Sequence, residues 1–244
     1  MKLSNNHLKE LIRLKQKKYR ELEGKVLVEG YRLIEQLHKN EIEIEEIFIS
    51  NQKKYDWKKI TCGKVFFAEQ WQLEKFGSTK APSNIAGLVK IKTVPIKEKR
   101  FLLYLDQIKE PGNLGTIIRT ATGAGISGIV ISPDCCEIFN PKVIRASMGT
   151  VFSFPIEIHD QEWLKKQESK IIATTMENAE NLFELQKFND DIILVLGSEA
   201  DGISKKIIEI ADHKIKIPVS NKIESLNVSV SAGICIYFLK DLQS

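Results

Sequence analysis

Short, mostly apolar runs recur along the second half of the chain, separated by segments with helical spacing. They occupy residues 101–106 (FLLYLD), 128–132 (GIVIS), 170–174 (KIIAT), 192–196 (IILVL) and 214–217 (KIKI). Such runs are typical of strands that are buried on both faces of a parallel sheet. Because helical segments alternate with them, the sequence predicts an α/β domain with a mainly parallel sheet and helices on both faces.

The first half of the chain also alternates between strand and helix patterns, but less regularly. Residues 1–25 carry leucine and isoleucine at helical spacing, and residues 26–49 read as strand, helix, strand. We expect further strands at 64–67 and 85–91 and a helix at 70–76. The lysine-rich segment that ends in KEKR at residue 100 is expected to be a linker. The sequence therefore predicts a smaller α/β domain at 1–98 and a larger one at 99–244.

The last segment, residues 215–239, is ambiguous. Its apolar residues alternate with small or polar ones, which favours a strand over Val228, Val230, Ala232, Ile234, Ile236 and Phe238. Its small residues Ser225, Ser229 and Gly233 fall four apart, which is typical of one thin helix face, and Ser225 can cap such a helix. Periodicity alone favours the strand.

Composition and charge narrow the class of protein. No apolar run approaches the roughly 20 residues that a membrane-spanning helix needs, and the N-terminus lacks the apolar core of a signal peptide. The four cysteines have no metal-ligand spacing, so we expect reduced thiols in a cytoplasmic protein. The net charge is +4, and residues 1–25 hold eight Lys or Arg against three Glu. That segment is either a solvated helix face or a surface for a polyanion such as RNA.

Two loops carry candidate chemistry. The first follows the run at 101–106 and reads DQIKEPGNLGTIIRTATGAG. It lacks the G-x-G-x-x-G pattern that a dinucleotide-binding turn requires. This loop places Asn113 at a helix start and Arg119 about a turn and a half later, where a plain surface arginine is the alternative. The second, IILVLGSEADGIS, brings Gly197 and Glu199 to a strand end, where open α/β sheets bind ligands, although Glu199 is also compatible with a solvated loop.

Three ordered stretches together resemble the SpoU (TrmH-like) family of RNA ribose 2′-O-methyltransferases in the SPOUT superfamily. They are NLGTIIRTATGAG, LVLGSEADGIS and IPVSNKIESLNVSVSAGICIYFL, and the resemblance covers residues 101–242. It implies a doubly wound sheet with a deep trefoil knot, an exception to the usual absence of knots. VLVEGYRLIEQ and KAPSNIAGLV also look like the family's N-terminal substrate-binding domain, which resembles a small RNA-binding ribosomal protein.

The resemblance implies S-adenosylmethionine as methyl donor, a homodimer with the active site near the subunit interface, and no metal. By motif, Gly197, Ile217 and Leu226 are expected to line the donor pocket, with Thr175 and Met176 in a further wall. It also implies that the segment from Ser225 onward is a helix that closes the knot, against the strand that periodicity favours.

For catalysis, the resemblance points to Arg119 as the residue that activates the ribose 2′-hydroxyl. An arginine is protonated and has no acceptor, so it cannot take a proton in its resting state. We expect Arg119 to bind a backbone phosphate of the RNA and so orient the hydroxyl; whether it also becomes the base is open. Asn113 and Glu199 are expected to position Arg119 and the nucleotide. Ser225 and Asn227 are expected to hold the target or the knot loops.

The sequence thus predicts an RNA 2′-O-methyltransferase that acts on ribosomal RNA, because of its appended N-terminal domain. Three alternatives stay open at this point. The first is the same chemistry on transfer RNA, and the second is a non-catalytic, knotted RNA-binding dimer. The third is a nicotinamide-dependent oxidoreductase, which the missing glycine fingerprint weakens.

Overall fold

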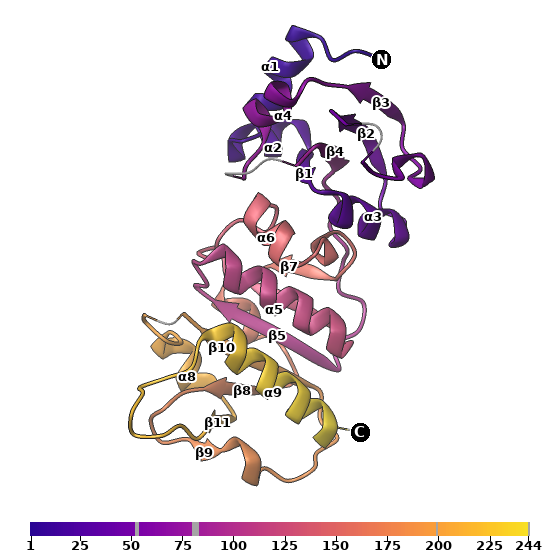
Figure 1. The fold of residues 1–244 in the computed structure, drawn as a ribbon. Coiled ribbons are helices and arrows are strands. Elements are labelled where there is room, and N and C mark those ends of the chain that lie inside the picture. The colour runs from indigo at the N-terminus through magenta and orange to yellow at the C-terminus, as the bar shows by residue number, and fades with distance from the viewer. Residues whose placement is uncertain (52–53, 80–82, 199, 244) are drawn as a thin grey trace. The chain divides into compact units, whose positions relative to one another are not determined.

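The computed structural model describes residues 1–51, 54–79, 83–198 and 200–243, and the chain forms two compact units (Figure 1). The first unit is Met1–Lys92 with Phe139–Ser153, and the second is Thr93–Ile138 with Phe154–Ser244. The chain thus first leaves the first unit after Lys92, whereas the sequence predicted a domain boundary near residue 98. A later segment returns to the first unit because Gly149 lies against Leu33 and Leu37, and Arg145 donates to Ser78 Oγ at 2.7 Å.

The first unit is a four-stranded sheet with helices packed against it. The strand order is β1-β4-β2-β3, in which β2 and β3 are parallel and the other neighbours antiparallel. The strands are β1 (Lys25–Glu29), β2 (Ile44–Ile49), β3 (Lys64–Phe67) and β4 (Ile85–Lys90). The helices are α1 (Asn5–Arg13), α2 (Lys17–Glu23), α3 (Tyr31–Lys39), α4 (Gln70–Phe76) and α6 (Pro141–Ala146), with short 3-10 turns η1 (Trp57–Lys59) and η2 (Thr150–Phe152). The predicted strand at 64–67 and helix at 70–76 are confirmed.

The core of the first unit explains the helical stripe at its N-terminus. Leu8 and Leu11 of α1 are buried against Phe48 of β2 and Phe76 of α4. Apolar side chains at this spacing share one face of a helix, which leaves the lysines of α1 and α2 on the opposite, solvated face. The apolar face of the N-terminal segment is therefore used for packing within its own unit.

The second unit is a seven-stranded sheet in which every pairing is parallel, in the order β7-β6-β5-β10-β8-β11-β9. Its strands are β5 (Phe101–Asp106), β6 (Gly128–Ile131), β7 (Ile156–Ile158), β8 (Lys170–Thr174), β9 (Glu180–Asn181), β10 (Ile192–Gly197) and β11 (His213–Lys216). Its helices are α5 (Pro111–Ala124), α7 (Gln161–Leu164), α8 (Lys205–Ile210) and α9 (Val228–Leu242), with a short 3-10 turn η3 (Leu182–Glu184). The parallel sheet predicted from the buried apolar runs is confirmed.

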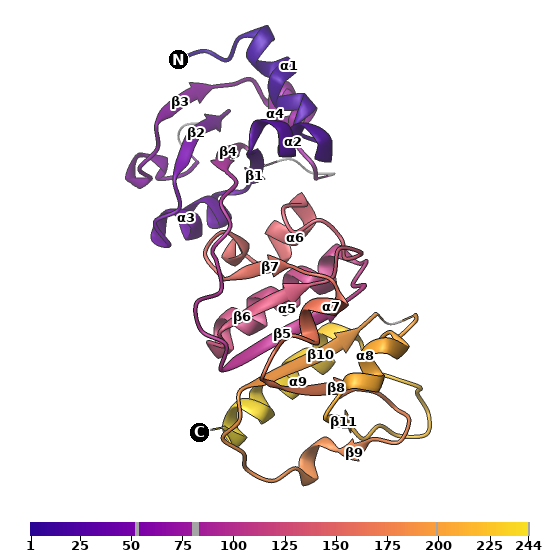
Figure 2. The same cartoon turned by 180° about the vertical axis from the view of Figure 1, so that it is seen from behind.

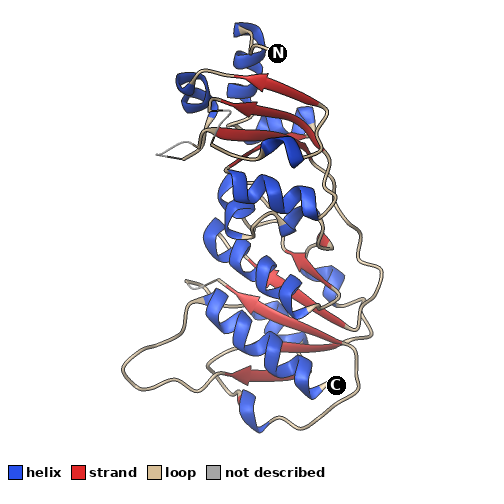
Figure 3. Cartoon of the chain, turned by 45° about the vertical axis from the view of Figure 1, so that its right-hand side comes forward, coloured by secondary structure: helices blue, strands red, loops and turns tan. Residues whose placement is uncertain are grey.

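Helices cover both faces of this sheet, as Figures 2 and 3 show. On one face, Leu164 of α7 and Ile207 of α8 pack with Leu102 and Tyr104 of β5. On the other face, α5 and α9 lie side by side. The strands β5 and β10 in the middle of the sheet are therefore buried along almost their whole length.

The ambiguous C-terminal segment is a helix, so the strand that its alternation favoured is wrong and the helix implied by the resemblance is confirmed. Its buried residues are Val228, Ala232, Cys235, Ile236 and Leu239, which recur at helical spacing. The helix begins at Val228, three residues after Ser225. Its cap is Asn227, whose Oδ1 accepts the Ser229 N–H at 2.9 Å, so the cap expected at Ser225 is wrong. Across the ranges that the structure describes, no helix has the length and apolar character needed to cross a lipid bilayer.

Candidate active site

A pocket of about 620 Å³ opens at the carboxyl edge of the parallel sheet in the second unit. Its walls are the segments that follow β8, β10 and β11, together with the first turn of α9. In a parallel sheet, backbone N–H groups and side chains gather at this edge, which is where open α/β folds bind ligands. All five positions expected to bind the donor line this pocket, namely Thr175, Met176, Gly197, Ile217 and Leu226.

The wall that follows β10 depends on a glycine. A Cβ at Gly197 would overlap the carbonyl carbon and oxygen of Gly202 and the nitrogen of Ile203. Ser198 and Gly202 form an antiparallel bridge, with the Gly202 N–H donating to the Ser198 carbonyl at 3.0 Å. Gly202 itself has a φ of 67°, a conformation that side chains with a Cβ adopt rarely. The two glycines therefore let the loop fold back onto the end of its own strand.

Asp106 holds the far end of this loop, and the sequence analysis did not identify it as a site residue. Its Oδ2 accepts the Ser204 N–H at 2.8 Å, across 98 positions of sequence. Asp106 pairs in register with Gly197, and its side chain is only 5% exposed. A buried carboxylate that accepts a backbone N–H forms a strong, charge-assisted hydrogen bond. Asp106 therefore fixes the loop that forms one wall of the pocket. The sequence feature that could have identified Asp106 is the single acidic residue at the end of the apolar run 101–106.

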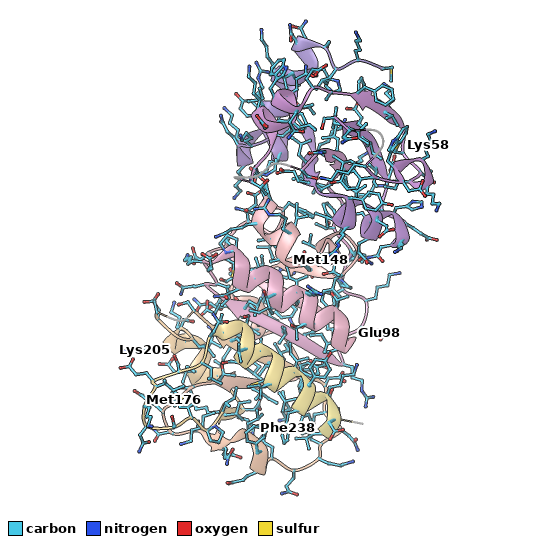
Figure 4. All side chains as sticks on the ribbon, viewed as in Figure 1. Lys58, Glu98, Met148, Met176, Lys205 and Phe238 are labelled. Carbon is cyan, nitrogen blue, oxygen red and sulfur yellow. The ribbon has the colours of Figure 1, made fainter. Side chains whose placement is uncertain are left out.

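The opposite wall comes from the segments after β8 and β11. The Thr175 N–H donates to the Ile215 carbonyl at 2.9 Å, which joins these two segments. Met176 is 51% exposed at the edge of the pocket, and Figure 4 shows Met176 and Lys205 on the side of the unit where α9 begins. Carboxylates and ammonium groups both line the pocket, at Asp201, Glu177 and Glu209 and at Lys205, Lys214 and Lys216. This lining suits a ligand that carries charges of both signs.

Two of the predicted catalytic residues meet beside the pocket. Asn227 Nδ2 donates to Asn113 Oδ1 at 3.1 Å, which links the first turn of α5 to the cap of α9. Ser225 and Val228, on either side of Asn227 in the sequence, both line the pocket. The sequence separates the two asparagines by 114 positions, so only the packing of α5 against α9 brings them together.

Arg119 is not joined to this arrangement. Arg119 is exposed on α5 and does not line the pocket, and within residues 1–51, 54–79, 83–198 and 200–243 it makes no hydrogen bond or ion pair. Glu199 lies outside the described residues. Asn113 and Asn227 thus meet beside the pocket, whereas Arg119 is an exposed residue of α5.

The thiols near the end of β5 are poor nucleophiles. Burial raises the pKa of Cys135 above its ordinary value, and burial together with the neighbouring Cys135 raises the pKa of Cys136 to about 12. Both thiols are therefore protonated at neutral pH, when only a thiolate attacks or binds a metal well. Among the described side chains, no three His, Cys, Asp or Glu residues are grouped so that they could hold a metal ion.

Comparison with protein families identifies the family of this fold. Residues 100–237, more than half of the chain, match the model of the SpoU rRNA Methylase family. The chain belongs to the SpoU rRNA methylase family. Residues 5–87 match the MRM3-like substrate binding domain. The resemblance drawn from the three motifs is therefore confirmed for the family.

Individual relatives align with this SpoU chain over nearly its full length. The 23S rRNA (guanosine(2553)-2'-O)-methyltransferase RlmP of Bacillus subtilis is 27% identical over 240 residues, which are 97% of this chain and 96% of that one. A crystal structure of an RNA 2'-O ribose methyltransferase is 26% identical with a TM-score of 0.83, covering 98% and 96% of the two chains. The AdoMet-bound rRNA methyltransferase from Sinorhizobium meliloti has a TM-score of 0.84 at 23% identity, covering 99% and 96%, and so shares the fold.

Proposed function

We propose that this protein is an S-adenosylmethionine-dependent RNA methyltransferase that transfers a methyl group to a ribose 2′-hydroxyl, with ribosomal RNA as its substrate. The observation that carries the proposal is the pocket at the carboxyl edge of the SpoU domain, into which five positions expected to bind the donor converge. The names of its relatives, several of which are 23S rRNA 2'-O-methyltransferases, favour ribosomal over transfer RNA. Such a substrate would place the protein in the cytoplasm.

The pocket has the features that this donor requires. Its volume of about 620 Å³ falls within the range of small-molecule sites, roughly 300–1,000 Å³. Gly197 has no side chain in the pocket wall, at a position where a Cβ would overlap the backbone of Gly202. Ile217 and Leu226 supply apolar contact. The lining carries both signs of charge, which matches a donor with a carboxylate, an ammonium and a sulfonium. When bound, the donor supplies an electrophilic methyl group on sulfur.

The remaining chemistry falls to the side chains around the pocket. Arg119 would bind a phosphate of the RNA backbone, because a guanidinium matches phosphate geometry and has no acceptor for a proton. This contact would orient the 2′-hydroxyl and favour its deprotonation. Asn113 and Glu199 would position Arg119 and the nucleotide, and Ser225 and Asn227 would hold the target or the knot loops. Most of the rate enhancement would come from alignment of oxygen, methyl carbon and sulfur. No metal has a role in this proposal.

We further propose that the enzyme is a homodimer in which Arg119 serves the pocket of the partner subunit. Arg119 is exposed on α5, beside α9, and does not line the pocket of its own protomer. Val230 and Tyr237 of α9 are 50% and 56% exposed, which leaves large apolar side chains on this surface. A two-fold axis along such a face would cover these side chains in both copies at once. We also propose that the segment ending in α9 is threaded as the family's deep trefoil knot.

Labelling with a methyl-radiolabelled donor tests the chemistry. The protein should label unmodified ribosomal RNA, and mapping should find the label on one ribose. Labelling of transfer RNA instead would change the substrate and keep the reaction, and labelling of neither RNA would refute the enzyme. Arg119→Ala should remove activity while donor binding and thermal unfolding stay unchanged. An Arg119→Ala variant with near wild-type turnover would refute the role given to this residue.

Mixing two inactive variants tests whether the site is shared. Arg119→Ala and Gly197→Ala should each be inactive, but random mixed dimers should recover roughly a quarter of the wild-type activity through one intact composite site in each heterodimer. If Gly197→Ala does not fold, Leu226→Asp in the pocket wall serves as the second variant. No recovery from variants that demonstrably exchange subunits would place Arg119 in its own protomer's site. Elution of the wild-type protein as a monomer would refute the dimer.

A further inference from the structure

An exposed tryptophan with a lysine over its ring lies on the first unit, where the proposed methyl transfer does not use it. Trp71 of α4 is 46% exposed, and Lys75 Nζ lies 4.7 Å from the centroid of its ring. The two residues are four apart in α4, so they occupy the same face of the helix. An indole that is nearly half exposed presents part of a flat aromatic ring to solvent.

The turn between α1 and α2 adds cations to this surface. Lys15 Nζ donates to the Lys75 carbonyl at 3.0 Å, so this turn lies against the end of α4. The turn is itself held by Arg20, which is only 3% exposed and donates to the Leu14 and Lys15 carbonyls at 2.8 Å each. The buried guanidinium of Arg20 thus orders the backbone at Lys15, whose ammonium group contacts the end of α4. Figures 1 and 2 show α1, α2 and α4 together in both views.

On either side of this turn, Arg13 at the end of α1 and Tyr19 of α2 form a second cation–aromatic pair. The guanidinium carbon of Arg13 lies 5.7 Å from the centroid of the Tyr19 ring. Residues 5–23 carry six Lys or Arg and three Glu, and Lys17 and Glu21 of α2 form an exposed ion pair at 3.6 Å. Exposed pairs of this kind contribute little and leave most of the positive potential in place.

The exposed indole and the cations of the first unit narrow the class of partner that this surface can bind. A membrane surface would require an apolar helix face, but Leu8, Leu11 and Leu14 are buried in the core of the first unit. An apolar protein partner would have to desolvate Lys75, which lies over the Trp71 ring, without a compensating charge. An RNA strand supplies phosphates for the cations and a flat base for the indole. Because bases inside an A-form duplex are stacked and inaccessible, the matching RNA is unpaired.

We propose that Trp71, with Lys75 over its ring, is a stacking platform for an unpaired base of the RNA substrate, whose flanking phosphates contact Lys75 and the cations of the neighbouring segment that joins α1 to α2. The inference rests on the proposed function, since it takes the bound RNA to be the methylation substrate. The platform would favour unpaired over paired RNA, while the pocket of the second unit sets the chemistry. It binds through ring stacking, which every base can provide, and so accounts for affinity for single strands without base readout.

Tryptophan fluorescence tests the platform without any turnover. The chain has three tryptophans, so a Trp57→Phe, Trp163→Phe variant retains Trp71 as its single reporter. Titration with an unstructured RNA oligonucleotide should quench this fluorescence, and a perfect RNA duplex of the same length should quench it far less. Equal quenching by both, or by neither, would refute the platform. Because this titration needs no methyl transfer, failure of the enzyme proposal and failure of the platform are distinguishable.

Steady-state kinetics provides the second test. Trp71→Ala should raise the KM for RNA by about tenfold, the size expected for loss of one stacked base, with kcat and the KM for the donor unchanged. Trp71→Phe should restore most of the affinity, because a smaller ring still stacks. In Lys75→Ala, the slope of log affinity against log salt concentration should decrease in magnitude by about 0.7, the amount expected for the loss of one phosphate contact. The matched control is Lys39→Ala, an exposed lysine of α3 that pairs with Glu35 at 3.4 Å and should leave the slope unchanged.

Discussion

The most direct test of the pocket is to add one methyl group to Gly197. In a Gly197→Ala variant the new Cβ would overlap the carbonyl group of Gly202 and the nitrogen of Ile203. These are backbone atoms, so no side chain can rotate to make room. The segment that holds Gly202 must move by on the order of 1 Å to restore ordinary contact. This movement strains two hydrogen bonds, from Gly202 N–H to the Ser198 carbonyl and from Ser204 N–H to Asp106.

The expected cost follows from these contacts. Overpacking typically destabilises by about 1–3 kcal/mol, and each weakened hydrogen bond contributes about 1 kcal/mol more. We expect a loss of about 3 kcal/mol in the free energy of unfolding of the second unit. For a domain of this size that loss corresponds to a decrease of roughly 10 °C in Tm. Because the displaced loop is a wall of the pocket, donor affinity should fall by at least tenfold, as measured by isothermal titration calorimetry.

A second glycine provides the control. A Cβ at Gly233, inside α9, would meet only Thr120 Cγ2 at 3.8 Å, which is ordinary contact. Gly233→Ala should therefore raise stability slightly, by about 0.5–1 kcal/mol, because alanine is the better helix former. If Gly197→Ala unfolds at the wild-type temperature and binds the donor with wild-type affinity, the steric reasoning about this loop is wrong.

Four further outcomes are expected. Asp106→Ala should weaken donor binding about tenfold in calorimetry and Asp106→Asn less, because the amide oxygen can still accept the Ser204 N–H. Asn227→Ala should lower the free energy of unfolding in urea by about 1 kcal/mol, since α9 loses its cap. Burial raises the pKa of Cys235 to about 12, so an aromatic disulfide reagent at pH 8 should leave this thiol unmodified until the protein unfolds. The Ile96 N–H lowers the pKa of Glu157 below its ordinary 4.5, so the Tm difference between wild type and Glu157→Gln should be largest at neutral pH and shrink as the pH falls below about 4.5.

The sign of the Glu157 effect follows from linkage. A carboxyl whose pKa is lower in the folded state contributes stability above its unfolded pKa, and this contribution is lost as the pH falls through the folded pKa. Glu157 Oε1 accepts the Ile96 N–H at 2.9 Å, and its Oε2 lies 2.9 Å from His159 Nε2. A Tm difference that grows on acidification would show that the carboxylate is not stabilised by these contacts.

Local patterning was sufficient to predict most of the secondary structure. Buried strands such as β5 and β10 are continuous apolar runs, because both of their faces are covered and no position tolerates a polar side chain. The helix α4 was predicted with its observed bounds because apolar residues at helical spacing lie between turn-forming segments. Patterning did not predict that Phe139–Ser153 joins the first unit, since contacts such as those of Gly149 with Leu33 and Leu37 are remote in sequence.

The C-terminal segment shows where patterning misleads. Residues 228–238 alternate as a strand does, but they form α9, in which Ala232, Cys235 and Ile236 are buried against the rest of the unit. Small residues such as Ser229 and Gly233 fit a strand as well as a helix. The local sequence therefore excludes neither a period of 2 residues nor a period of 3.6 residues. The packing of α9 against α5 and β10 decides the matter, and only the resemblance to a family pointed to the helix beforehand.

The sequence by itself determined the class of fold, the strand ends from which the site is built, and the family to which the chain belongs. The reason is that the apolar run of a buried strand and the residues of a motif both consist of neighbours in the sequence. Only the tertiary structure decided that Asn113 meets Asn227 and that Asp106 holds Ser204, pairs 114 and 98 positions apart. It also explained Gly197, whose missing side chain makes room for a backbone that returns to it. Contacts between remote segments depend on how whole elements pack, and no local pattern records that packing.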